Sequence, residues 1–82
     1  MEMEKFRAWL KRSAGLGDRS AKDVVSRLRR VATLVNIDSR LATDDLLHKL
    51  GKNPQFKELK LTVRSQLRRA VKLYREFGGD HE

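Results

Sequence analysis

The sequence contains no cysteine, one proline, five glycines and only five aromatic residues among 82. Without cysteine, disulfide frameworks and thiolate metal sites are excluded. No apolar run approaches the roughly 18–20 residues of a membrane-spanning helix, and the first five residues lack the apolar stretch of a signal peptide. We therefore expect a soluble, cytoplasmic protein with no membrane partner.

A chain of this length forms one domain, residues 1–82, with a thin core and little room for a deep pocket. Nineteen Lys and Arg residues stand against eleven Asp and Glu residues, a net charge of +8. Such a charge favours polyanionic partners: nucleic acid, an anionic membrane or an acidic protein face.

Apolar residues recur at helical spacing almost throughout, which predicts an all-α protein. We expect helices at about 3–13, 20–35, 43–50 and 62–77, forming a compact four-helix orthogonal bundle with a short third helix. Residues 78–82 are expected to be a tail that is frayed over 80–82. Residues 55–59 are expected to be loop or a single helical turn.

Local signals set the expected helix ends. Ser20, Thr43 and Thr62 are predicted N-caps, Gly15 is predicted in the left-handed conformation after the first helix, and Gly78-Gly79 is predicted to end the last helix. The predicted core includes the five aromatic residues and, between the helices, two leucines: Phe6, Trp9, Phe56, Tyr74, Phe77, Leu59 and Leu61.

The positive charge is concentrated in two segments. Residues 19–30 carry five basic residues and one acidic, a net +4, and residues 57–75 carry seven basic and one acidic, a net +6. At 100° per residue, four basic residues of the last helix fall within about 80° of one another, roughly opposite its apolar stripe: Arg64, Arg68, Lys72 and Arg75. Arginine predominates, and a guanidinium can bind two phosphate oxygens at once. The predicted nucleic-acid-binding residues are Lys22, Arg29, Arg30, Arg64, Arg68, Lys72 and Arg75.

The aromatic residues do not alternate with the basic ones, so base stacking with single strands is disfavoured and duplex DNA is favoured. We find no glycine-rich phosphate loop and no zinc pattern, and Tyr74 lies on an apolar face. The sequence therefore predicts no enzyme, no cofactor, no metal site and no small-molecule substrate.

The sequence resembles the SAM-like N-terminal core-binding domain of tyrosine recombinases, the phage integrases. The resemblance covers residues 6–77 and is carried by the segments FRAWL (6–10), SAKDVVSRLRR (20–30), TDDLL (43–47) and LTVRSQLRRAVKLYREF (61–77). It implies that the second and fourth helices lie toward the major groove of duplex DNA. The recombinase catalytic domain is missing, so DNA binding is implied and DNA cleavage is not. The 51–60 connection is also longer than is usual in the family.

Two further interpretations stay open. A small phage-type inhibitor or other protein-interaction module would use the basic face to bind an acidic host protein or a ribonucleoprotein such as a CRISPR nuclease. RNA binding is the weaker option. The sequence also leaves open whether the chain is a whole protein or part of a larger one.

Overall fold

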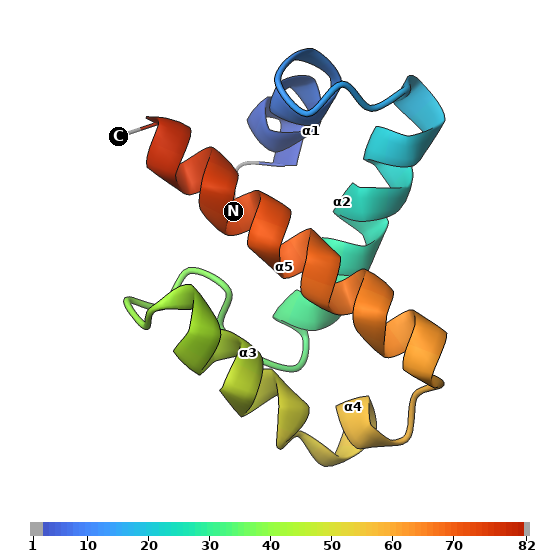
Figure 1. Ribbon diagram of the computed structural model, residues 1–82, viewed down its shortest axis with the longest axis vertical. Helices are drawn as coiled ribbons and strands as arrows, with labels where there is room; N and C mark the ends of the chain where they lie inside the picture. Colours follow the sequence, from blue (N-terminus) through green and yellow to red (C-terminus); the bar gives the residue numbers. More distant parts are fainter. Residues whose placement is uncertain (1–2, 82) are drawn as a thin grey trace.

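The structure is a computed structural model that describes the backbone of residues 3–81 and the side chains of residues 3–78. All regular structure in that part of the chain is helical: α1 (Met3–Arg12), α2 (Asp18–Ala32), α3 (Thr43–Gly51), α4 (Pro54–Lys57) and α5 (Leu61–His81), shown in Figure 1. The all-α prediction is confirmed. The described helices number five rather than four, because the segment after Asn53 forms a single turn whose first two free amides, those of Gln55 and Phe56, donate to the Asn53 Oδ1.

Helix α2 begins two residues earlier than predicted. Gly17, not Ser20, is its N-cap, and no side chain caps it. The carboxylate of Asp18 supplies negative charge to the first turn instead, which stabilises the positive end of the helix dipole. Helix α2 also ends early, at Ala32, but Val35 is still buried because the turn that follows folds it against the core.

The other two predicted N-caps are also wrong. Ala42 is the N-cap of α3, so that Thr43 is its first helical residue. Helix α5 begins at Leu61, so Thr62 lies inside its first turn. In both cases the backbone closes the first turn without a hydroxyl cap.

Gly78 and Gly79 do not end the last helix, which continues to His81. A glycine inside a helix is less favourable than an alanine by only about 1 kcal/mol. Phe77, which is buried between Phe6 and Trp9, holds the adjacent turn in place. The predicted helix end at Gly78-Gly79 is therefore wrong: the expected tail is helical over residues 78–81, and Glu82 lies outside the described residues.

Helix α5 organises the core. It crosses α2, its most extensive partner, and also packs against α1 and α3 (Figure 1). The core is entirely apolar over the described residues, and it includes four of the five aromatic side chains. Leu61 was predicted to fill space between helices, but it is 66% exposed. It is the first residue of α5 and lies about 160° around the helix axis from Val63, which packs against the core.

Gly15 has a φ of +69°, as its predicted left-handed conformation requires. We expect Gly15→Ala to destabilise the protein by about 1 kcal/mol, because a Cβ is strained at positive φ. Gly78→Ala is the matched substitution inside α5, where an added Cβ meets no atom within 4 Å. Because α5 continues through Gly78, this change should raise the free energy of unfolding by about 0.5–1 kcal/mol. Urea denaturation measures both, and an unchanged or lowered stability for Gly78→Ala would place the helix end before residue 78.

Candidate nucleic-acid interface

Helix α2 presents three of the predicted DNA-binding residues to solvent. Lys22, Arg29 and Arg30 are all exposed, because the opposite side of the helix, which includes Val24 and Leu28, is buried in the core. Among the described residues, none of the three cations forms an ion pair. Their charge is therefore available to a partner.

The three cations lie on two flanks of α2. Lys22 and Arg29 line a pocket of about 250 Å³ between α1 and α2, together with Arg7 of α1. Arg30 lines a different pocket of about 410 Å³, between the end of α2 and α4. The sequence did not indicate Arg7, because its approach to α2 depends on how α1 packs.

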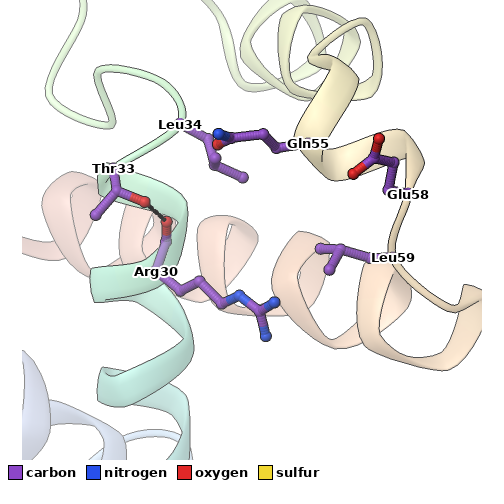
Figure 2. A pocket seen from close by; sticks show the side chains of 6 residues that line it. All are labelled: Arg30, Thr33, Leu34, Gln55, Glu58 and Leu59. Atoms are coloured by element: carbon purple, nitrogen blue, oxygen red, sulfur yellow. Dashed lines mark hydrogen bonds between the residues drawn. The ribbon is translucent and has the colours of Figure 1, made fainter.

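Figure 2 shows the second pocket. Arg30 extends from α2 into the opening. Glu58, the residue that follows α4, lies on the opposite wall. The two charged groups make no ion pair in the structure. The Thr33 hydroxyl donates to the Arg30 carbonyl at 2.6 Å, so it caps the end of α2 and is already used locally.

The predicted DNA-binding residues of α5 are less exposed than those of α2. Arg64 and Arg68 are half-buried, whereas Lys72 is exposed. The guanidinium of Arg68 lies 5.4 Å from the centroid of the Phe56 ring, a cation–π contact, and the Arg64 Nε is buried without a hydrogen-bond partner. The basic stripe therefore runs along the border of the apolar face rather than opposite to it.

Arg75 has a structural role that the sequence did not predict. Its Nη1 donates to the carbonyls of Ile37 (3.2 Å) and Ser39 (2.9 Å), and its Nη2 donates to the Leu41 carbonyl. One turn of residues 37–41 is thereby attached to α5, and the neighbouring Tyr74 hydroxyl donates to the Asp38 Oδ1 at 2.6 Å. We therefore leave Arg75 out of the candidate interface.

We expect Arg75→Met to lower the free energy of unfolding by about 2–4 kcal/mol. The substitution keeps most of the apolar stem but leaves three carbonyls without a charged donor. Lys72→Met, one turn earlier on α5 and exposed, is the matched control and should change stability by no more than about 0.5 kcal/mol. Equal urea midpoints for the two variants would contradict the structural role of Arg75.

Asp18 joins α1 to the start of α2. Its Oδ1 accepts from the Arg7 Nη2 at 2.9 Å and lies 3.2 Å from the Lys11 Nζ. The hydrogen bond from Arg7, followed by that from Lys11, lowers the pKa of the Asp18 carboxyl from its ordinary value of 3.8. The side chains of all three residues are exposed.

A lowered folded-state pKa makes this contact pH-dependent. Its contribution to stability is complete above the ordinary pKa of 3.8 and is lost as the pH falls through the lower folded-state value. We expect the stability difference between wild type and Asp18→Asn to shrink from pH 7 to pH 2.5, measured by urea denaturation at low salt. In an Arg7→Gln/Lys11→Gln background the pH dependence of the same difference should be smaller, because only the interaction of the Asp18 charge with the α2 dipole remains. An undiminished pH dependence in that background would contradict the two ion pairs as its main cause.

Neither of the two pockets described above brings basic residues of α2 and α5 together. The two helices pack against each other through apolar residues. The candidate interface therefore has two parts: Lys22, Arg29 and Arg30 on α2, and Arg64, Arg68 and Lys72 on α5.

No helix in the described part of the chain is long and apolar enough to cross a membrane. The same residues contain no group of three or more potential metal ligands.

A scan against protein-family models, a search of curated proteins and a search of solved structures each found no match. The resemblance to recombinase core-binding domains thus stays a prediction that depends on the residues quoted above.

Proposed function

We propose that this protein is a non-catalytic module that binds the backbone of duplex DNA, with α2 as its main contact and α5 as a second one. The observation that carries the proposal is the set of exposed α2 cations, Lys22, Arg29 and Arg30, which have no acidic partner among the described residues. Cations without an acidic partner contribute no ion pair to the fold, whereas the phosphates of a nucleic-acid backbone would pair with them.

The distribution of aromatic residues supports a duplex over a single strand. Phe6, Trp9, Phe56 and Phe77 are each at most 5% exposed, and Tyr74 packs on the core, where it contacts the Phe6 ring. None of these rings is presented to solvent as a platform on which unpaired bases stack. Contacts to the backbone of a duplex need no such platform.

The recombinase resemblance supports the same partner. In this proposal α1, α2, α3 and α5 correspond to the four helices of a SAM-like core-binding domain, and the single turn α4 lies within the longer 51–60 connection. The second and fourth of those helices are the ones that carry the predicted DNA-binding residues. The correspondence rests on helix order and residue pattern.

Salt dependence tests the proposal. If six phosphates are contacted, the affinity for a random-sequence 20-base-pair duplex should fall by about 10³-fold between 50 and 200 mM salt, because counterions are released on binding. Fluorescence anisotropy measures this change directly. A decrease of less than tenfold would contradict binding through the backbone.

The α2 contacts are tested by the variant Lys22→Gln/Arg29→Gln/Arg30→Gln. Each lost phosphate contact lowers the slope of log K against log salt by about 0.9, so the slope should fall by roughly 3. The matched control, Arg12→Gln/Arg40→Gln/Lys49→Gln, removes the same charge from exposed sites on α1, the 33–42 connection and α3, and its slope should stay near the wild-type value.

Circular dichroism confirms that both triple variants are folded. Equal slopes for the two would indicate attraction by net charge alone. Failure of the wild type to bind DNA at 50 mM salt, together with capture of a purified acidic protein or ribonucleoprotein, would favour the protein-interaction alternative.

A further inference from the structure

The pocket between α1 and α2 combines positive charge from two helices. Three of its lining side chains are exposed cations: Arg7 from α1, and Lys22 and Arg29 from α2. Its one carboxylate, that of Glu4, is exposed and forms no ion pair with a described residue. The charged lining is therefore positive overall.

The remaining lining residues suit a phosphate and its sugars. The Ser26 hydroxyl is exposed and is not used in a hydrogen bond within the described part of the chain, so it can donate to a phosphate oxygen. Met3 and Val25 supply apolar surface that is half-buried and buried, respectively. Together these groups match the alternating anionic and apolar parts of a sugar-phosphate chain.

The size of the pocket favours an extended chain that passes through it, rather than a small molecule that it encloses. Its volume of about 250 Å³ is below the range of about 300–1,000 Å³ that is typical of small-molecule pockets. All of the charged groups that line it are exposed, so no wall excludes water from them. An extended polymer needs only one group at a time to lie in such a groove.

We propose that the groove between α1 and α2 seats a phosphate of the DNA backbone, and that Arg7 is one of the residues that bind it. This inference rests on the proposed function and adds α1 to the interface. Arg7, Lys22 and Arg29 bind the phosphate oxygens, and the Ser26 hydroxyl donates a hydrogen bond to them.

The ion pair of Arg7 is compatible with this role. Arg7 binds Asp18 through one contact, and Lys11 lies within 3.2 Å of the same carboxylate oxygen. When Arg7 turns to a phosphate, Lys11 still compensates the charge of Asp18. Glu4, by contrast, repels a phosphate in the groove and weakens binding.

Four single variants test the groove by anisotropy with the 20-base-pair duplex between 50 and 200 mM salt. Arg7→Gln should lower the salt slope by about 1, whereas Arg12→Gln, an equal loss of charge at the exposed end of α1, should leave it unchanged. Glu4→Gln should raise the affinity at 50 mM salt severalfold. Asp45→Asn, an equal gain of charge on α3, should raise it by less than twofold.

The failures of the two proposals are distinguishable. The proposed function stands if wild type binds DNA and the α2 triple variant lowers the salt slope. The groove proposal is nevertheless overturned if Arg7→Gln has the same slope as Arg12→Gln and Glu4→Gln the same affinity as Asp45→Asn. If wild type does not bind DNA, both are overturned.

An NMR titration with inorganic phosphate separates a nucleic-acid backbone from a free anion. Under the proposal, duplex DNA shifts the amide signals of residues 4–7 and 22–29 at micromolar concentration, and inorganic phosphate does so only at far higher concentration. Saturation by inorganic phosphate below 1 mM without equivalent shifts on DNA would overturn the proposal in favour of a free-anion site.

Discussion

The packing of Phe6 is the contact on which the rest of the structure depends. This fully buried side chain in α1 meets the rings of Tyr74 and Phe77 in α5, at centroid distances of 5.3 and 5.5 Å, and that of Trp9 in its own helix at 6.2 Å. It therefore joins the first helix to the last, and α2 is held between them by its own apolar face. Aromatic rings contribute large buried areas, which matters in a chain whose short length limits its core.

This use of the aromatic residues determines what remains for the surface. The described residues have no buried polar side chain, so the charged groups lie outside the core or on its border. Two border residues, Arg68 over Phe56 and Arg75 against the 37–41 turn, show that some of that charge also serves the fold. The cations of α2 serve no such purpose, because the structure gives them no internal partner over the described residues.

Much of the fold was predictable because it follows from periodicity. The amphipathic pattern located the four longer helices, and the need for positive φ identified Gly15. Helix ends were less predictable: a carboxylate at Asp18 and a buried ring at Phe77 outweighed the local signals of Ser20 and Gly78. The role of Arg75 had one visible sign, its position about 40° from buried Val71 on the helix, but the carbonyls that it binds carry no side-chain pattern.

For the candidate interface too, the sequence predicted what lies on one helix but not what two helices bring together. A helical wheel finds residues that share a face of one helix, so it identified Lys22 and Arg29 but not Arg7, which reaches the same pocket from α1. It also grouped Arg29 with Arg30, although the two line pockets on different flanks of α2. A polyanion that follows α2 therefore meets positive charge on both flanks, and the flank beside α1 provides a groove. Because the charged groups that line this groove are exposed, an extended backbone held at several points fits the proposed function better than a ligand that must be enclosed.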